Sequence, residues 1–172
     1  MVLLPIFIFI MIIIFLEDGL PVFFRQKRVG KNNKYFQIYK FRTMKKNTPN
    51  LATHLLKNSG NYFTLTGPFL RKSSLDEIPQ LINIIKGDMV FVGPRPALYN
   101  QEDLIILRKK SEVEKLTPGI TGWAQVNGRD LISIEAKVAY DKYYLDNKSI
   151  LLDLKILILS FIKVIKFDGV LK

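Results

Sequence analysis

The chain has 172 residues, 48% of them hydrophobic and 24% charged, which suits one domain of ordinary size and excludes disorder as the dominant state. It has no cysteine and one histidine, His54, which argues against thiolate or histidine-rich metal sites and against a Ser/His/Asp triad. Any catalysis must therefore use carboxylates, lysine, arginine, hydroxyls or a hard cation. The net charge of +11 indicates an anionic partner, such as nucleic acid, anionic lipid or a phosphorylated substrate.

Residues 1–16 carry no charged or polar side chain, and nine basic residues against two acidic ones follow over residues 17–46. At ~1.5 Å per residue the apolar run forms a helix of roughly 24 Å, shorter than the ~30 Å hydrocarbon core of a bilayer. The basic cluster places its C-terminal side in the cytosol. Three alternatives stay open: a marginal transmembrane helix, a re-entrant helix, which is favoured, and a buried core helix. Pro5 would kink a helix interior but costs little in a first turn.

The middle of the chain predicts short strands and helices. Aromatic and apolar alternation predicts strands over residues 21–29 and 35–44, joined by a turn at 30–33 into a basic hairpin. The further expected elements, in chain order, are a loop over 45–68 with a short helix near 51–57, a helix over 75–85 that ends at Gly87, an apolar segment at 89–92, a helix over 98–115, a glycine-rich loop over 117–130 and a helix over 133–146.

Residues 150–167 are mostly aliphatic, with Lys155, Lys163 and Lys166 within one broad arc of a helix. Lysines on one side and large apolar side chains on the other describe a helix that lies in the headgroup plane of a membrane. A C-terminal helix packed on the domain core is an equal alternative. Together these elements predict an α+β fold with an N-terminal membrane-inserted helix, a small hairpin and several helices, some of them interfacial.

Asp76 and Glu77 are adjacent acids that follow a pair of cations, Arg71 and Lys72. Two carboxylates beside a cationic pair can hold Mg²⁺ and attack a phosphorus atom. The alternative is local: Ser74 and Glu77 have the spacing of a capping box, and acids are favoured in the first turn of a helix. A helix that begins nearer Asp76 would make Asp76 itself the cap.

Other polar residues could recognise an anion. Arg95 lies between two prolines that fix the backbone, and a planar guanidinium suits bidentate phosphate binding; the alternative is an ordinary turn arginine. Lys40 and Arg42 alternate with aromatic residues and would share one face of a strand, which is also typical of a plain amphipathic strand. Gln125 and Arg129 lie in the glycine-rich loop, which could approach a ligand closely or serve as a structural turn.

The order of these motifs is more specific than any one of them. It closely resembles the bacterial sugar transferase family over about residues 4–170. The residues that carry the resemblance are PVFFRQKRVG at 21–30, KFRTM at 40–44, LRKSSLDEIPQL at 70–81, GDM at 87–89, VGPRP at 92–96 and PGITGWAQVNGR at 118–129.

Members of this family are monotopic phosphoglycosyl transferases at the cytoplasmic face of the bacterial inner membrane. The resemblance implies an enzyme that moves a sugar 1-phosphate from a UDP-sugar to polyprenyl (undecaprenyl) phosphate, releasing UMP, at the first membrane step of surface glycan assembly. It implies a ping-pong mechanism with Asp76 as nucleophile and with Asp76 and Glu77 as ligands of Mg²⁺. The substrate-binding residues that it implies are Lys40, Arg42, Arg71, Arg95, Gln125 and Arg129.

The resemblance also implies two parts, a membrane-inserted helix at 1–16 and a catalytic domain at 17–172, with no nucleic-acid partner. Family members usually carry a longer basic and aromatic segment before the apolar helix and Ser-Pro at its break, whereas this chain has Leu4-Pro5. Two alternatives follow. One is an N-terminally truncated, inactive relative that binds Mg²⁺ and UDP-sugar without turnover. The other is a basic binding module at the membrane surface.

Overall fold

The computed structural model describes residues 3–48, 59–128 and 132–166. Helices and two small sheets alternate along the chain, which confirms the predicted α+β class. Packing divides the chain into two compact units, each with its own core. The first unit comprises Met1–Phe24 and Tyr39–Pro79, and the second comprises Arg25–Ile38 and Gln80–Lys172. The predicted division at residue 17 concerns the membrane and stays a prediction.

The first half of the chain contains one long helix, a hairpin and several short helical turns. The basic hairpin is confirmed, although its second strand ends at Phe41, three residues earlier than predicted. The elements are α1 (Leu3–Asp18), β1 (Phe23–Val29), the 3-10 turn η1 (Lys31–Asn33), β2 (Tyr35–Phe41), η3 (Ser59–Tyr62), α2 (Gly67–Lys72) and η4 (Leu75–Gln80). The short helix expected near 51–57 lies outside the described residues.

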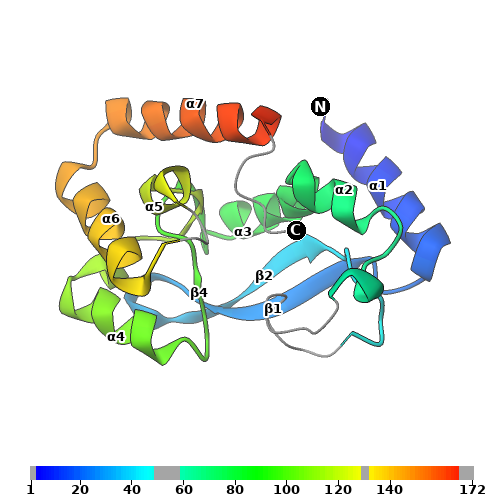
Figure 1. The fold of residues 1–172 in the computed structure, drawn as a ribbon, viewed down its shortest axis with the longest axis horizontal. Helices are drawn as coiled ribbons and strands as arrows, with labels where there is room; N and C mark the ends of the chain where they lie inside the picture. The colour runs from blue at the N-terminus through cyan, green and yellow to red at the C-terminus, as the bar shows by residue number, and fades with distance from the viewer. Residues whose placement is uncertain (1–2, 49–58, 129–131, 167–172) are drawn as a thin grey trace. The chain divides into compact units, whose positions relative to one another are not determined.

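One face of α1 (blue in Figure 1) packs on the core of the first unit. Ile10 and Ile14 are buried one turn apart, together with Phe41 of β2 and Leu70 of α2. The rest of the helix is exposed and apolar, at Leu4, Ile6, Ile8, Phe9, Ile12, Phe15 and Leu16. Pro5 lies in the first turn of the described part of α1. A proline at that position interrupts no helical hydrogen bond.

The second unit contains the remaining elements. They are α3 (Leu81–Ile85), β3 (Val90–Val92), β4 (Ala97–Leu98), α4 (Glu102–Lys110), η5 (Val113–Lys115), β5 (Gly119–Thr121), α5 (Trp123–Asn127), α6 (Ile134–Asn147) and α7 (Ile150–Lys166). The larger sheet has the order β2-β1-β4, and Arg28 pairs with Leu98 in an antiparallel register. The smaller sheet pairs β3 with β5 in parallel, with Val90 opposite Gly119.

Two apolar clusters form the core of the second unit. α6 contacts both α4 and α5 (Figure 1), and its predicted start is confirmed by Ser133, whose Oγ accepts a hydrogen bond from the backbone N–H of Ala136. α7 packs through a narrow stripe of Leu152, Ile156 and Leu159. The packing alternative describes this stripe. A wide apolar face stays exposed at Ile150, Leu151, Leu154, Leu157, Ile158, Phe161, Ile162 and Ile165, and the position of α7 in a headgroup plane stays a prediction.

Among the described residues, no helix combines the length and apolarity that a crossing requires.

Three predicted elements differ from the structure. The helix over 75–85 is instead the 3-10 segment η4 followed by α3, because Pro79 has no N–H to donate inside a continuous α-helix. The helix over 98–115 is shorter and stops at Lys110, and Glu112, in the left-handed region at φ +63°, separates α4 from η5.

The glycine-rich loop over 117–130 was also mispredicted, since it contains β5 and the short helix α5. Its glycines allow two backbones to come together. A Cβ added to Gly119 would lie 2.2 Å from the backbone nitrogen of Gly93, so only glycine permits β5 to reach this segment.

Candidate active site

The two adjacent acids lie in the first turn of η4, and Lys40 near the end of β2 points at them. Lys40 Nζ is 2.6 Å from Glu77 Oε1 and 3.9 Å from Asp76 Oδ2. The three side chains are only 15%, 12% and 10% exposed, in the order Lys40, Glu77, Asp76. A charge-assisted contact this well shielded from water is stronger than a surface ion pair. The first unit therefore holds a compact carboxylate–cation cluster.

Arg71 adds a second cation from the last turn of α2. Its Nε donates a hydrogen bond to Thr43 Oγ1 at 2.9 Å, and its guanidinium carbon lies 4.8 Å from the centre of the Phe63 ring. Burial lowers the pKa of Arg71, and the negative charge of Asp76 opposes that shift. An arginine titrates so far above neutral pH that it stays charged, so Arg71 places a fixed positive charge near Asp76.

The capping-box alternative does not describe the acid pair. Ser74 has φ +58°, whereas a capping residue is normally extended. The carboxylate of Glu77 accepts a hydrogen bond from Lys40, 37 residues away in the chain. The acids do lie in the first turn of η4, as the local interpretation requires, but a long-range cation binds them.

The donor set fits a magnesium ion. Mg²⁺ in proteins is commonly bound by one or two carboxylates, with substrate phosphates and water as the other ligands. Asp76 and Glu77 supply two such carboxylates in a buried setting. Within the described ranges, no group of three or more His, Cys, Asp and Glu side chains could hold a metal. An ion at this pair would therefore depend on phosphate oxygens or water to complete its shell.

Arg42 follows β2 and points away from the strand face that it was predicted to share with Lys40. Its Nη2 donates to the carbonyl oxygens of Asp18 at 3.0 Å and Gly19 at 2.8 Å, and lies 3.1 Å from Asp18 Oδ2. The guanidinium thus caps the C-terminal end of α1, where a cation is favoured by the helix dipole. Among the described residues, the buried Nε and Nη1 of Arg42 have no hydrogen-bond partner.

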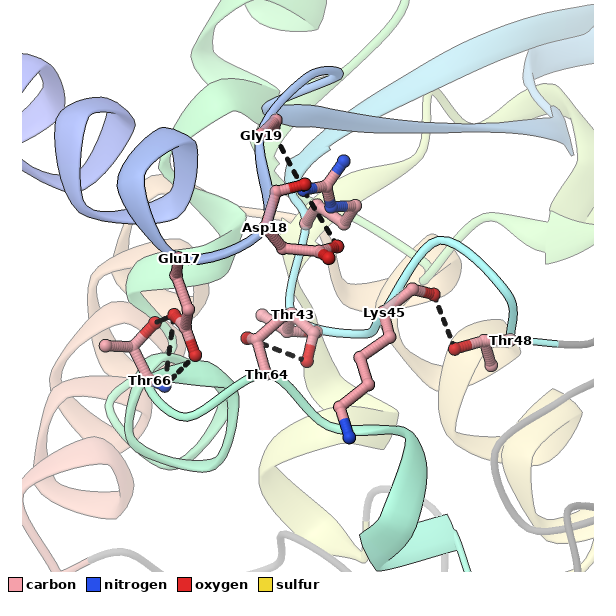
Figure 2. A network of polar contacts seen from close by, with 9 residues as sticks. Glu17, Asp18, Gly19, Thr43, Lys45, Thr48, Thr64 and Thr66 are labelled. Atoms are coloured by element: carbon pink, nitrogen blue, oxygen red, sulfur yellow. Dashed lines mark hydrogen bonds and ion pairs between the residues drawn. The ribbon is translucent and has the colours of Figure 1, made fainter.

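The same end of α1 is also tied to α2. Figure 2 shows the Glu17 carboxylate beside Thr66, and it accepts hydrogen bonds from Thr66 Oγ1 at 2.7 Å and Thr66 N at 3.1 Å. Thr66 is the capping residue of α2, the helix that carries Arg71. Thr64 Oγ1 in turn donates to the carbonyl oxygen of Thr43. Sequence reasoning noted Glu17 and Asp18 only as charges, and nothing in their spacing indicates these partners.

The remaining predicted residues belong to the second unit. Arg95 is half-buried between β3 and β4, and its carbonyl oxygen accepts a hydrogen bond from Arg108 at 2.8 Å. Gln125 lies on α5, where its Nε2 donates to the carbonyl oxygen of Ile120, while its buried Oε1 has no hydrogen-bond partner among the residues described. Arg129 lies outside the described residues. The structure thus brings together Lys40, Arg71 and the acid pair in one unit, and places Arg95 and Gln125 in the other.

A shielded carboxylate pair that faces a lysine and an arginine in an α+β protein is suited to chemistry on phosphate esters. Comparison with known proteins makes this class specific. The bacterial sugar transferase family matches residues 1–167, so the chain belongs to this family. The resemblance inferred from the order of the motifs is confirmed.

Three relatives illustrate the match. The uncharacterized sugar transferase EpsL of Bacillus subtilis is 45% identical over 171 residues, covering 96% of this chain and 80% of the relative. The UDP-glucose:undecaprenyl-phosphate glucose-1-phosphate transferase of Escherichia coli is 38% identical over 151 residues, covering 83% of this chain and 32% of the relative. The undecaprenyl-phosphate galactose phosphotransferase of Salmonella typhimurium is 34% identical over 171 residues, covering 89% and 35%. The chain spans about a third of the last two relatives.

Proposed function

We propose that this chain transfers a sugar 1-phosphate from a UDP-sugar to polyprenyl (undecaprenyl) phosphate, giving polyprenyl-diphosphate-sugar and UMP at the first membrane step of surface glycan assembly. The observation that carries this proposal is the contact of Lys40 with the acid pair, in a chain of the bacterial sugar transferase family. Two relatives named for undecaprenyl-phosphate sugar phosphotransfer support the reaction class.

In the first step, a carboxylate oxygen of Asp76 attacks the sugar-bearing phosphorus of the donor. The bond from that phosphorus to the UMP oxygen breaks, and the sugar phosphate is left as an acyl phosphate on Asp76. A carboxylate approaches a phosphate anion only where the negative charge is offset. Lys40 and Arg71 provide two fixed positive charges beside the acid pair and are the donor-binding cations of this unit.

Asp76 and Glu77 are also the residues that would hold Mg²⁺, which when bound would offset the charge of the donor diphosphate. Lys40 contacts Glu77 more closely than Asp76, which holds the Glu77 carboxylate in place beside the nucleophile. This division of roles supports Asp76 as the nucleophile and Glu77 as its positioning neighbour.

In the second step, an oxygen of polyprenyl phosphate attacks the same phosphorus, and the bond to Asp76 breaks. The acceptor oxygen is already anionic, so no general base is required to remove a proton. This agrees with a chain that has one histidine and no cysteine. Arg42, Arg95, Gln125 and Arg129 stay predicted substrate-binding residues, each open to test by substitution.

The exposed apolar surfaces support action at a membrane. In the first unit, the outer face of α1 exposes Leu4, Phe9 and Leu16, each more than half accessible. In the second unit, α7 exposes Ile158 and Phe161 to a similar extent. Exposed faces made of several large apolar side chains mark interaction sites. A membrane is a suitable partner because the proposed acceptor is a lipid. We place α1 in the cytoplasmic face of the bacterial inner membrane, as a re-entrant helix, and α7 in the headgroup plane.

The test is UMP release by the detergent-extracted protein with Mg²⁺, polyprenyl phosphate and a panel of UDP-sugars. We expect one donor to give UMP, EDTA to stop its release, and Asp76→Asn to abolish turnover. Asp146→Asn is a matched control, because Asp146 forms an exposed ion pair with Lys142 on α6. Without acceptor, the wild-type protein should retain sugar phosphate covalently and Asp76→Asn should not. Near-normal turnover by Asp76→Asn would exclude Asp76 as nucleophile, and donor binding without any UMP release would favour an inactive relative.

A further inference from the structure

The backbone around Arg95 is held by three hydrogen bonds to three successive carbonyl oxygens. Gly119 N donates to the carbonyl oxygen of residue 94 at 3.0 Å, Arg108 Nη1 to that of residue 95 at 2.8 Å, and Arg28 Nη1 to that of residue 96 at 3.0 Å. The donors come from β5, α4 and β1. Residues 94 and 96 are prolines without an N–H, so carbonyl oxygens are the main backbone groups by which this segment can be held.

Arg108 is itself fixed by a buried carboxylate. Its Nε and Nη2 lie 3.1 Å and 2.6 Å from Asp141 Oδ2, while Nη1 donates to Arg95. Asp141 is 1% exposed and Arg108 is 8% exposed. All three guanidinium nitrogens therefore have a partner. Asp141 on α6 fixes the orientation of the planar guanidinium, and the guanidinium in turn fixes the carbonyl group of Arg95. A lysine has one nitrogen at this point and cannot replace such a fork.

Stability alone is a weak reason for this pair. Burying two charges costs solvation energy that their attraction repays only in part, and apolar replacements of buried pairs are often neutral or stabilising. Burial raises the pKa of Asp141, and Arg108 and Lys137 oppose that shift only partly. Keeping Asp141 ionised in this buried setting is thus energetically unfavourable. The third nitrogen of Arg108 nevertheless donates to the carbonyl oxygen of Arg95, a predicted substrate-binding residue.

We propose that Arg108, oriented by Asp141, is a positioning residue that presets the backbone of Arg95 for binding the diphosphate of a nucleoside diphosphate sugar. This inference rests on the proposed function for the identity of the ligand. Arg108 acts only through Arg95, because its guanidinium is buried and its three nitrogens are already engaged. An arginine whose main chain is preset loses less freedom on binding a phosphate, which lowers the KM of the donor.

The test is a double-mutant cycle between Arg108 and Arg95, read as the donor KM and kcat of UMP release. Arg108→Lys should raise the donor KM by about tenfold, within the up to ~100-fold that a small misplacement can cost, and change kcat much less. In an Arg95→Ala background, Arg108→Lys should raise the donor KM no further. Lys109→Gln, an exposed neighbour on α4, and Asp146→Asn on α6 should leave both parameters unchanged.

Two results would overturn the inference. One is a wild-type donor KM in Arg108→Lys, and the other is an equal rise of KM in both backgrounds, which would show a general structural role. Arg108→Lys keeps a positive charge beside Asp141, and Arg108→Met, with the charge removed, gives a second variant should the first not fold.

Binding separates this inference from the proposed reaction. Calorimetric titration of UDP into the same variants should show the same pattern in Kd as in KM. If no UDP-sugar gives UMP with the wild-type protein, the reaction fails, while the titration still tests Arg108. If the wild-type protein is active and neither Kd nor KM responds to Arg108→Lys, only the positioning role fails.

Discussion

Lys40 Nζ lies 2.6 Å from Glu77 Oε1 and 3.9 Å from Asp76 Oδ2, so one cation near the end of β2 serves two adjacent acids. The contact is unequal. Glu77 takes the hydrogen bond from Lys40, and Asp76 lies within the field of both Lys40 and Arg71. An inequality of this kind gives two neighbouring carboxylates different chemical roles.

Lys40→Gln should reduce kcat/KM for the sugar donor by about 100- to 1,000-fold, because one preorganised cation beside the developing phosphate charge is lost. UMP release measures this effect. Lys46→Gln, an exposed lysine six residues further on, is the control and should retain activity. A Lys40→Gln enzyme within twofold of wild type would show that Lys40 only neutralises the acid pair.

Arg42→Gln should lower the free energy of unfolding by about 2–4 kcal/mol, because the end of α1 loses a buried ion pair and two hydrogen bonds. Thermal unfolding followed by circular dichroism measures the loss, with Lys46→Gln again as the control. If Arg42→Gln has an unchanged melting temperature and a raised donor KM, the result would instead support the substrate-binding role that the motif predicts for Arg42.

Ile158→Glu on the exposed face of α7 should weaken binding to vesicles that contain anionic lipid. Removing one isoleucine from an apolar contact costs about 2 kcal/mol, which lowers the partition constant by more than about tenfold. Sedimentation with the vesicles gives this constant. Asn100→Glu adds the same charge at an exposed position outside α7 and should bind as wild type. Equal vesicle binding by the two variants would show that the exposed face of α7 does not contact the membrane.

Tyr144→Phe should destabilise the second unit by about 1–3 kcal/mol. The Tyr144 hydroxyl lies 2.7 Å from Asp153 Oδ1 and 3.2 Å from the carbonyl oxygen of Val92, so it joins α6 to α7 and β3. Tyr143→Phe is the matched control, because Tyr143 is half-exposed and stacks on Trp123 through its ring. Equal melting temperatures for the two variants would contradict the prediction.

The difference in stability between wild type and Tyr144→Phe should depend on pH. Burial, with Asp153 as a further cause, raises the pKa of Tyr144 above its ordinary value of about 10. The folded protein therefore holds this proton more tightly than the unfolded chain. The resulting stability is present below pH ~10 and is lost as the pH rises further. The advantage of wild type over Tyr144→Phe should thus shrink between pH 9 and pH 11, and a constant difference would contradict it.

Asp141 gives a prediction at low pH. Because burial raises its pKa, the folded protein binds this proton more tightly than the unfolded chain does. Protonation of Asp141 therefore makes its largest contribution to the free energy of unfolding below pH ~4. This contribution is lost as the pH rises through the folded-state pKa. Relative to Asp141→Asn, wild type should gain stability as the pH falls from 7 to 4. Denaturant unfolding at both pH values checks this, and Asp146→Asn should show a much smaller change.

Elements with strong local signals were predictable from sequence. The hairpin was expected from its aromatic and basic residues around a central turn, and a helix was expected over residues 133–146, where α6 lies. The helix over 75–85 failed because periodicity gave the apolar positions without the effect of Pro79. The strand β5 was missed because three residues around Gly119 have no strand pattern of their own, and only pairing with β3 makes them a strand.

The family can be assigned from the amino-acid sequence alone, since the order and spacing of the motifs are readable without coordinates and the family match covers residues 1–167. The sequence also identified Asp76 and Glu77 as the candidate acids. Which cation contacts these two acids depends on the folded chain and cannot be read from their spacing. Lys40 and Arg42 are two residues apart, yet Lys40 contacts the acid pair and Arg42 the end of α1. The reason is physical: β2 ends between them at Phe41, and a buried guanidinium turns to the carbonyl groups that the end of α1 leaves unpaired.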